Sequence, residues 1–408
     1  MSTKKKIALV NVFFAPQSIG GATRVLMDNF DLLRKGYAED YDLVVFTSDH
    51  GSQKPHTLTT YLHEGVRVYR AGIVYRINMD WNPHDPVMGE LFSKFLELEK
   101  PDIVHFHCIQ RLGSGIVEAT IAMSIPYIVT IHDAWWISDY QFLMDRESNV
   151  YQDGHPDVFA PLLTPEGVST QESLNRRTHL KSLLSKASSV QVVSQAFEQI
   201  YNHNGVINTV PNPNGINSRE WKKRATSYTN KICIAHIGGM AEHKGYHIFK
   251  QALLALPYKN LEALVVDHSV PSNHVAKDMW GTVPVKYIGK VPQEKIEDLY
   301  AQMDVLVAVS IWPESFGLVT REATAAGVWV IASNIGGIGE DIVQGVTGVV
   351  IPPALNALIE VCHQLDQLGT PPKVPKHAKE QIRTVRIQVD KVVETYDQIL
   401  HGGETTGD

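Results

Sequence analysis

The chain has 408 residues, of which 44% are hydrophobic and 20% are charged, and its formal net charge is −7 at pH 7. A chain of this length is too long for one ordinary hydrophobic core, so two domains of roughly 150–200 residues each are expected. The negative charge argues against general nucleic-acid binding, no apolar run reaches the roughly 18 residues of a membrane span, and three widely spaced cysteines fit a reducing, cytoplasmic compartment.

The first expected strand, residues 6–14, is a nearly continuous apolar run of the kind buried in a parallel sheet. Lysines precede it as in a signal peptide, but Asn11 interrupts the run and no small-residue cleavage site follows. Gly20 and Gly21 come next, before an expected helix, and their backbone would allow close approach to an anion. A simple tight turn is the alternative interpretation of this glycine pair.

Apolar runs at 42–48, 66–71, 102–107, 127–133 and 189–194 alternate with amphipathic stretches such as 86–100, which predicts a doubly wound α/β domain. His105 and His107 share one face of a strand, but no third metal ligand stands at a telling distance. His132 ends a strand at the carboxyl edge of the sheet, where ligands bind in such folds, although it could instead cap the strand by hydrogen bonds. Trp135 and Trp136 follow, either as platforms for sugar rings or as the floor of a cleft.

Residues 138–175 show no clear periodicity and predict a long loop excursion. The next helix, 173–187, carries Arg176, Arg177, Lys181 and Lys186 together with leucines, so it could lie on an anionic membrane. The alternative is an ordinary packed helix with a solvated face. Residues 209–230 are crowded with Pro, Asn, Gly and charge, and they predict the domain boundary.

A second alternating block predicts another doubly wound domain. Its expected strands are 231–239, 261–267, 285–291, 305–310, 329–333 and 348–353, and its expected helices include 243–256, 293–303 and a tail helix over 376–400. The predicted fold is therefore α/β, with two Rossmann-like, doubly wound domains. The expected divisions are a first domain at 1–213, a linker at 214–229 and a second domain at 230–380, with a C-terminal helix at 381–400.

The stretch 312–327 places two carboxylates around a predicted helix start. Glu314 lies in the loop after an apolar run, and Glu322 lies eight positions later, inside the expected helix. Backbone N–H groups near Phe316, Gly317 and Leu318 would attract an anion such as a diphosphate. Carboxylates on either side of that diphosphate would accept hydroxyl hydrogen bonds, which describes a nucleotide-diphosphate sugar. A surface helix with two solvated glutamates is the alternative.

The same two glutamates, followed by the glycine-rich run SNIGGIGE at 333–340, resemble the donor-site signature of retaining GT-B glycosyltransferases of family GT4. This resemblance implies two domains that face each other across a cleft, with the donor bound mainly by the second domain and the acceptor by the first. It implies that Gly20 and Gly21 face the donor diphosphate and that the final helix returns to the first domain. It also implies a hinge at VPNPNGIN and no metal requirement.

The resemblance further assigns roles to residues. Lys244 precedes a glycine at a helix start and would meet phosphate, Glu314 would lie near the anomeric carbon, and Glu322 would hold the ribose hydroxyls. The expected catalytic residues are Glu314, His132 and Lys244; the expected donor-binding residues are Gly20, Gly21, Gly239, Lys244, Glu314, Ser315, Phe316, Gly317, Leu318 and Glu322; the expected acceptor-binding residues are Trp135 and Trp136.

The chain departs from the family pattern at Gly239, where the family usually carries a phosphate-binding arginine. Candidates to replace that cation are His236, His243, His247 and Arg321. The expected activity is transfer, with retention, from a UDP or secondarily a GDP sugar to a glycan or lipid-linked acceptor in bacterial polysaccharide synthesis, in the cytoplasm or at the inner face of the membrane. No cofactor is expected. A nucleotide-sugar-binding protein without turnover and a nucleotide-sugar epimerase remain as alternatives.

Overall fold

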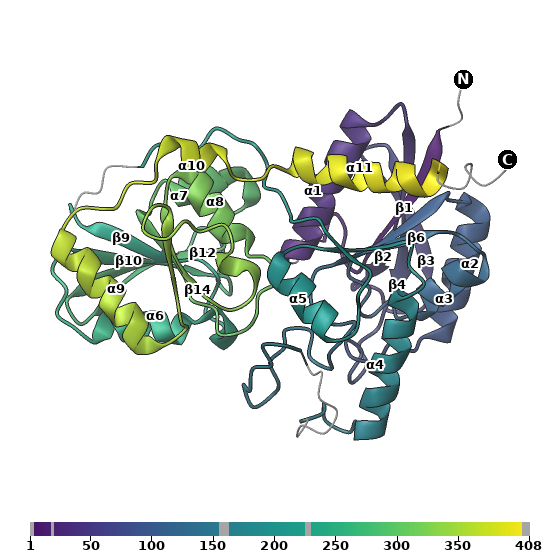
Figure 1. Cartoon of the computed structure of the whole chain (residues 1–408), viewed down its shortest axis with the longest axis horizontal. Helices are drawn as coiled ribbons and strands as arrows, with labels where there is room; N and C mark the ends of the chain where they lie inside the picture. The colour runs from purple at the N-terminus through teal and green to yellow at the C-terminus, as the bar shows by residue number, and fades with distance from the viewer. Residues whose placement is uncertain (1–3, 18–19, 155–162, 225–229, 402–408) are drawn as a thin grey trace. The chain divides into compact units, whose positions relative to one another are not determined.

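The computed structural model describes residues 4–17, 20–154, 163–224 and 230–401 (Figure 1). They form two compact units, here called unit 1 (residues 1–217 and 384–408) and unit 2 (residues 218–383). Parts of the predicted loop excursion and linker, residues 155–162 and 225–229, lie outside the described residues.

Unit 1 is built on one sheet, whose order within the described residues is β3-β4-β2-β1-β5-β6-β7-β8. All neighbours are parallel except β3 and β4. The strands are β1 (Lys5–Asn11), β2 (Tyr41–Asp49), β3 (Leu58–His63), β4 (Val66–Gly72), β5 (Ile103–Phe106), β6 (Tyr127–Ile131), β7 (Ser189–Val192) and β8 (Thr209–Pro211).

Helices cover both faces of this sheet. One hydrophobic core holds side chains of α2 (Pro86–Glu99), α3 (Gly115–Ala122), α4 (Thr170–Leu184) and α5 (Gln195–His203). The core on the other face holds side chains of α1 (Gly20–Gly36) and α11 (Val385–His401), which lie together in Figure 1. The last helix of the chain therefore completes the core of unit 1.

Unit 2 repeats this plan with the strand order β11-β12-β10-β9-β13-β14-β15 in its described part. Only β11 and β12 pair antiparallel. The strands are β9 (Ile232–His236), β10 (Leu261–Asp267), β11 (Val275–Trp280), β12 (Val283–Gly289), β13 (Val305–Ala308), β14 (Trp329–Ser333) and β15 (Gly348–Ile351).

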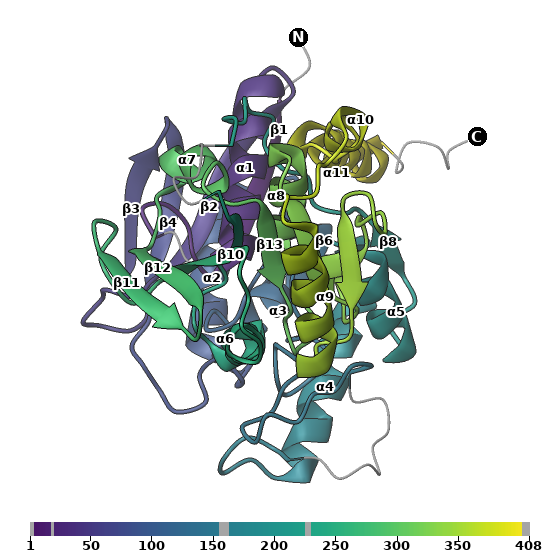
Figure 2. The ribbon, with the colours of Figure 1, turned by 90° about the vertical axis from the view of Figure 1, so that its left-hand side faces the viewer.

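The helices of unit 2 again form two layers. The core on one face contains side chains of α6 (Tyr246–Leu254) and α9 (Leu355–Leu368), and both helices are visible in Figure 2. The core on the other face contains side chains of α7 (Ile296–Tyr300) and α8 (Leu318–Ala326), and α10 (Lys376–Glu380) packs on α8. Short 3-10 turns are η1 (Glu242–Lys244), η2 (Gln293–Lys295) and η3 (Gly337–Gly339).

The structure corrects the predicted tail helix. Residues 376–400 do not form one helix, because α10 ends at Glu380 and α11 begins at Val385. Thr384 instead pairs with Ile216 in an isolated parallel bridge. Gly215 allows this close approach, since a Cβ atom there would lie 2.1 Å from the Thr384 carbonyl carbon. The backbone of this short segment therefore bonds to a neighbouring segment rather than to its own helix.

Each sheet has one topological switch point, where strand order reverses on either side of two neighbouring strands. In unit 1 it lies between β1 and β5, and in unit 2 between β9 and β13. Ligands of open α/β sheets bind just beyond the carboxyl ends of the strands at such points. The strand order alone therefore predicts two candidate ligand sites, one in each unit.

Candidate functional site

A Lys–Glu ion pair lies at the switch point of unit 2. Lys244 ends η1 after β9, and Glu314 lies in the loop after β13. The Lys244 Nζ atom donates a 3.0 Å hydrogen bond to Glu314 Oε1, which also accepts a short hydrogen bond from the Ser310 hydroxyl. Lys244 Nζ also lies 5.1 Å from the centre of the Trp312 ring. Topology has thus brought together a cation and a carboxylate that are 70 residues apart in the chain.

The surroundings of Glu314 keep its carboxyl group ionised. Burial by itself would raise the pKa of Glu314, but the charge of Lys244 and the hydrogen bonds from Ser310 and Lys244 lower this pKa below its ordinary value. The group is therefore a carboxylate at neutral pH. A nearly buried carboxylate of this kind can accept a hydroxyl hydrogen bond or stabilise a nearby developing positive charge.

The glycine-rich run after β14 holds the Glu314 loop in place through the backbone. Gly337 donates its N–H to the Glu314 carbonyl oxygen at 2.7 Å, and Gly336 forms a parallel bridge with Glu314. Gly336 has a positive φ of 69°, and a Cβ atom there would lie 2.4 Å from the Glu314 carbonyl oxygen. Only glycine fits this approach without a shift, so the run positions the candidate carboxylate.

The start of α8 presents backbone N–H groups beside this pair. The helix begins at Leu318, after Gly317 with a φ of 86°. The first N–H groups of any α-helix lack intrahelical acceptors, so they attract anions. Arg321 secures the turn, because its Nη1 atom donates to the carbonyl oxygens of Phe316 and Ile338 and its guanidinium lies 4.0 Å from the centre of the Phe316 ring. Ser315 is half-buried in the same loop.

Glu322 lies one turn into α8, and its side chain is buried, with 2% of the residue exposed. Its Oε2 atom accepts a 3.0 Å hydrogen bond from the hydroxyl of Tyr300 on α7. The predicted solvated surface helix is therefore excluded for Glu322. Its predicted role, to accept hydrogen bonds from the ribose hydroxyls, stays a prediction. The sequence pattern did not predict Tyr300 as its partner.

The structure narrows the choice of a cation to replace the family arginine at Gly239. The ring nitrogens of His236 lie 3.2 Å and 2.8 Å from the carbonyl oxygens of Val307 and Gly239, and burial lowers its pKa to about 4. The ring is therefore neutral and donates to one of these oxygens. Arg321 is committed to the carbonyl oxygens at the start of α8 and to Asp341. Neither residue supplies the missing cation. His243 is also kept neutral, because burial and Lys244 lower its pKa.

A hydrogen-bonded histidine pair lies at the carboxyl edge of the sheet in unit 1. His107 follows β5 and His132 follows β6, and His107 Nδ1 lies 2.9 Å from His132 Nε2. His105 stacks on His107 at 4.4 Å and bonds to the hydroxyls of Tyr396 and Thr130. Burial lowers the pKa of His105 to about 3 and that of His132 to about 4, so both rings are neutral.

The geometry selects one tautomer for the pair. His107 Nε2 is buried and has no hydrogen-bond partner among the residues that the structure describes. If Nε2 carried the proton, an N–H donor would be left buried without an acceptor, which proteins rarely tolerate. His107 Nδ1 therefore carries the proton and donates it to His132 Nε2. His132 in turn is protonated at Nδ1 and offers a fixed N–H donor.

The two tryptophans that follow His132 are both buried and meet edge to face at 5.3 Å. Both belong to the hydrophobic core, and Trp135 also lines a pocket of unit 1. Their predicted role in acceptor binding stays a prediction. Gly20 and Gly21 are exposed at the start of α1, and Gly20 has a φ of 79° with open space around its missing side chain. The positive φ favours glycine at that position, and the predicted close approach to an anion stays a prediction.

Helix α4 presents only part of the basic face that the sequence predicted. Arg176 and Arg177 are buried, and Arg176 donates to the carbonyl oxygens of Ser138, Trp81 and Trp135. Half of the expected basic face thus points into the protein. Among residues 4–17, 20–154, 163–224 and 230–401, no helix is both long and apolar enough to cross a membrane, and no cluster of three or more His, Cys, Asp or Glu is placed to hold a metal ion.

Two family models match consecutive parts of the chain. Residues 20–215 match the glycosyl transferase 4-like domain, and residues 217–384 match the glycosyl transferases group 1. An uncharacterized glycosyltransferase of Methanocaldococcus jannaschii is 24% identical over 370 residues, which cover 85% of each chain. The D-inositol 3-phosphate glycosyltransferase of Rhodococcus erythropolis is 34% identical over 113 residues, but these cover only 26% of this chain and 25% of that protein.

Solved structures with the same fold span nearly the whole chain. Sucrose-phosphate synthase from Thermosynechococcus elongatus superimposes with a TM-score of 0.70 at 18% identity, covering 98% of this chain and 100% of that one. HepE from Anabaena, solved in complex with UDP and glucose, gives a TM-score of 0.63 at 19% identity, covering 97% and 100%. The predicted family and fold are thus confirmed: the chain belongs to the GT4-type glycosyltransferases and has the GT-B fold.

Proposed function

We propose that this glycosyltransferase takes its sugar from a nucleoside diphosphate donor, and that the switch point of unit 2 holds the diphosphate. The observation that carries the proposal is the Lys244–Glu314 pair beside the start of α8. Lys244 Nζ has three N–H donors, of which one is used by Glu314, so the others can meet phosphate oxygens. The N–H groups of the first turn of α8 add a neutral anion-binding surface.

These groups have separate tasks in the proposed reaction. When the bond between the anomeric carbon and the diphosphate breaks, negative charge grows on the leaving phosphate, and Lys244 with the α8 amides stabilises it without a metal. Glu314 accepts a hydroxyl hydrogen bond from the donor sugar and lies near the positive charge that grows at the anomeric carbon. Glu322 holds the ribose hydroxyls. Retention of configuration follows in this proposal from family membership.

Two further observations support details of the donor and acceptor. The HepE structure from Anabaena contains UDP and glucose, which favours a UDP sugar, with a GDP sugar as the next choice. His132 and its fixed N–H donor lie at the corresponding edge of unit 1, where we place the transferred sugar or the acceptor hydroxyl. We propose a glycan or lipid-linked acceptor in polysaccharide synthesis. Helix α4 offers no support for membrane contact, because Arg176 and Arg177 are buried.

Gly239 favours a second candidate, a protein that binds a nucleotide sugar without turnover. Its φ of 80° suits glycine, and no side chain stands there to supply the arginine that the family pattern leads us to expect. In this alternative, Lys244 and the amides of α8 still bind the diphosphate, but too weakly in the transition state for transfer. An epimerase of the same fold would instead convert the donor alone into a new isomer.

Calorimetry with UDP, GDP, ADP, CDP and dTDP tests the donor site. One nucleotide, expected to be UDP, should bind with clear preference, and Lys244→Met should weaken it by about tenfold or more because a charge-assisted contact to phosphate is lost. Lys277→Met, at an exposed position on β11, is the matched control and should bind normally. The proposal is wrong if no nucleotide binds, or if both variants bind as well as the unchanged protein.

A donor panel incubated with and without chelator and with mixed glycan acceptors then separates the candidates. Transfer that continues in the presence of chelator supports the metal-independent transferase. Nucleotide binding with neither transfer nor hydrolysis supports the binding protein. A new sugar isomer, formed from donor alone, supports the epimerase.

A further inference from the structure

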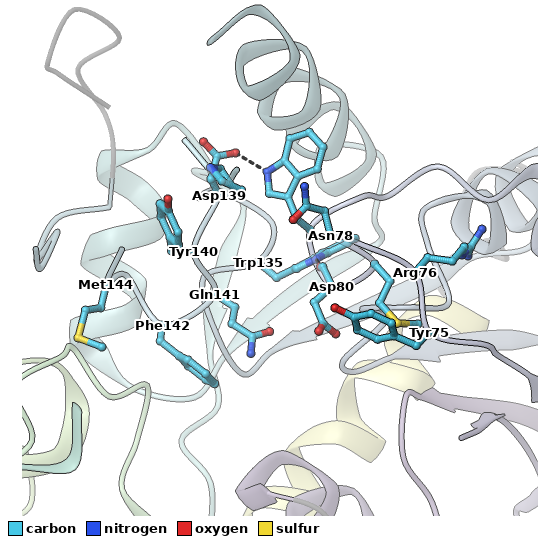
Figure 3. A pocket seen from close by; sticks show the side chains of 13 residues that line it. Tyr75, Arg76, Asn78, Asp80, Trp135, Asp139, Tyr140, Gln141, Phe142 and Met144 are labelled. Carbon is cyan, nitrogen blue, oxygen red and sulfur yellow. Dashed lines mark hydrogen bonds between the residues drawn. The ribbon is translucent and has the colours of Figure 1, made fainter. Parts of the chain in front are cut away.

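A pocket of about 360 Å³ opens on unit 1 (Figure 3). Two segments, residues 75–81 and 139–144, supply most of its wall, and Trp135 lies between them. Trp135 comes three residues after His132, and its backbone N–H donates to Asp133 Oδ1 at 2.9 Å. The pocket is thus connected to the strand end that carries the candidate histidine. Its volume is typical of a small-ligand site and suits a molecule of about one or two sugar rings.

Aromatic rings are prominent in the accessible wall. Tyr75 is 80% exposed, Phe142 is 39% exposed and Tyr140 is half-buried. Asn78 and Gln141 add amide groups to the same wall. Aromatic faces pack against the C–H groups of a sugar ring, and amides donate to and accept from its hydroxyls. The wall therefore matches a polyhydroxylated ring better than a purely apolar molecule.

The charged groups of the wall are already paired with each other or with neighbours. Arg76 donates to Asp85 at 2.7 Å. Asp80 receives two bonds from Arg111, at 2.5 Å and 3.0 Å. A phosphate group needs a cation that can turn toward it, and here the one lining arginine is bound to a carboxylate. A phosphorylated ligand would also approach the carboxylate of Asp80.

The remaining lining carboxylate is equally satisfied. Asp139 accepts one hydrogen bond from Trp81 Nε1 at 2.8 Å, drawn in Figure 3, and another from Ser173 at 2.5 Å. Because neither lining carboxylate lacks partners, an ammonium group on the ligand would gain little from them. The electrostatics of the wall thus favour an uncharged occupant.

The pocket is held open by a buried arginine of α4. Arg176 donates to the carbonyl oxygens of Trp81, in the first wall segment, and of Trp135, which lies between the two segments. Its guanidinium lies 5.0 Å from the centre of the Trp135 ring. These bonds tie the segment 75–81 to Trp135 through groups of the protein itself, so this part of the wall is formed before binding. A pre-formed wall reduces the ordering cost of binding a small polar molecule.

From this geometry we infer that the pocket binds the acceptor, and that the acceptor end it receives is an uncharged saccharide rather than a phosphorylated sugar. The assignment of the occupant as the acceptor rests on the proposed function, whereas the preference for an uncharged saccharide rests on the pocket alone. The phosphate-bearing end of a lipid-linked acceptor, if one is used, would lie outside this pocket.

Saturation-transfer NMR on the full chain tests this inference, with a panel of uncharged disaccharides and their 6-phosphates as probes, each recorded with and without UDP. We expect saturation transfer to some of the uncharged disaccharides and to none of the 6-phosphates. Tyr75→Ala and Phe142→Ala should each weaken the best disaccharide by about tenfold, because a stacking surface is lost. Ile77→Ala is the matched control, since Ile77 is 82% exposed in the same segment and does not line the pocket.

Three results would overturn the inference: no disaccharide binds, the 6-phosphates bind better, or both aromatic variants bind as tightly as Ile77→Ala. UDP calorimetry on the same variants keeps the two proposals apart. Intact UDP binding with failed saccharide binding rejects the pocket assignment alone. Saccharide binding without any nucleotide binding rejects the donor site and retains the pocket.

Discussion

The two switch points share one topology, but one carries a charged pair of side chains and the other a neutral pair. In unit 2, Lys244 and Glu314 form an ion pair near the N-terminus of α8. In unit 1, the same edge carries His107 and His132, which are buried, neutral and bonded to each other. Both edges lie where ligands bind in sheets of this kind. We propose that the side chains fit the edge of unit 2 to an anion and the edge of unit 1 to hydroxyl groups.

The two edges differ in how they compensate the free-energy cost of burying an ionisable group. Moving a charge out of water is costly, so a buried ionisable group either finds a partner or becomes neutral. Glu314 has Lys244 and Ser310 as partners, and it stays charged. His105 and His132 have only neutral partners, and burial lowers their pKa values. The contrast predicts different responses to pH and to mutation.

Mild acid should have the largest effect, because we expect it to unfold unit 1 before unit 2. The pKa values of His105, His107 and His132 are lowered by burial, to about 3 for His105 and about 4 for His132. Unfolding restores an ordinary pKa near 6.5, so the unfolded chain binds protons first, and stability is lost as pH falls from about 6.5 toward 4. Asp133, whose pKa burial raises to about 6, acts in the opposite direction and offsets part of this loss.

In unit 2, His236 makes the same kind of contribution, but the stabilisation from Glu314 is lost only below its ordinary pKa of 4.5. Hydrogen exchange followed by mass spectrometry, at several pH values and corrected for the intrinsic exchange rate, should show loss of protection in β5 and β6 before β9 and β13. Earlier loss in unit 2 would contradict this explanation.

Neutralising the charged edge should have the next largest effect. Glu314→Gln keeps the shape of the side chain and removes its charge, so we expect kcat to fall by about 10²–10³-fold while nucleotide affinity changes little. Steady-state kinetics with the preferred donor measure both quantities. Glu294→Gln, an exposed position on η2, serves as the control and should leave kcat unchanged. Equal kinetics for the two variants would remove Glu314 from the mechanism.

The contact between Gly336 and the Glu314 loop can be tested by comparing alanine variants at two glycines. Gly336→Ala adds a Cβ atom 2.4 Å from the Glu314 carbonyl oxygen, whereas Gly345→Ala adds one in open space at a similar φ, 75° against 69°. Both variants carry backbone strain, but only the first must displace the Glu314 loop. We expect Gly336→Ala to lower the free energy of unfolding by about 1–3 kcal/mol more than Gly345→Ala, measured by urea denaturation. Matching values would show that the loop tolerates the displacement.

The smallest effect is expected at Tyr300. Tyr300→Phe removes the hydrogen bond to Glu322 and should cost about 0.5–1.5 kcal/mol of unfolding free energy. Because Glu322 then loses one of the contacts that orient it, nucleotide affinity should also fall severalfold. Tyr258→Phe is the control, since its buried hydroxyl bonds only to the Ala252 carbonyl oxygen among the interactions that the structure describes. A loss of nucleotide affinity in both variants would point to general loosening of unit 2.

The local sequence pattern was sufficient to predict much of the fold. Apolar runs predicted the central strands of both sheets, because strands buried on both faces must be continuously apolar. The run at 66–71 predicted β4, but β3 was missed, since it lies at a sheet edge and mixes exposed with half-buried residues. The turn between β3 and β4 uses Glu64 and Gly65, both at positive φ, which is a weak signal in a single sequence.

The sequence by itself determined the fold class, the positions of Glu314, Glu322 and Lys244 near helix starts, and His132 at a strand end, because each follows from a pattern within a few neighbouring residues. Only the tertiary structure decided that Lys244 meets Glu314, that His107 sets the tautomer of His132, that Gly336 supports the Glu314 loop, and that Arg176 is buried behind a pocket. These contacts join residues from about 20 to 95 positions apart. Periodicity tells which side of its own element a residue occupies, but it carries no information about the partner that packs there.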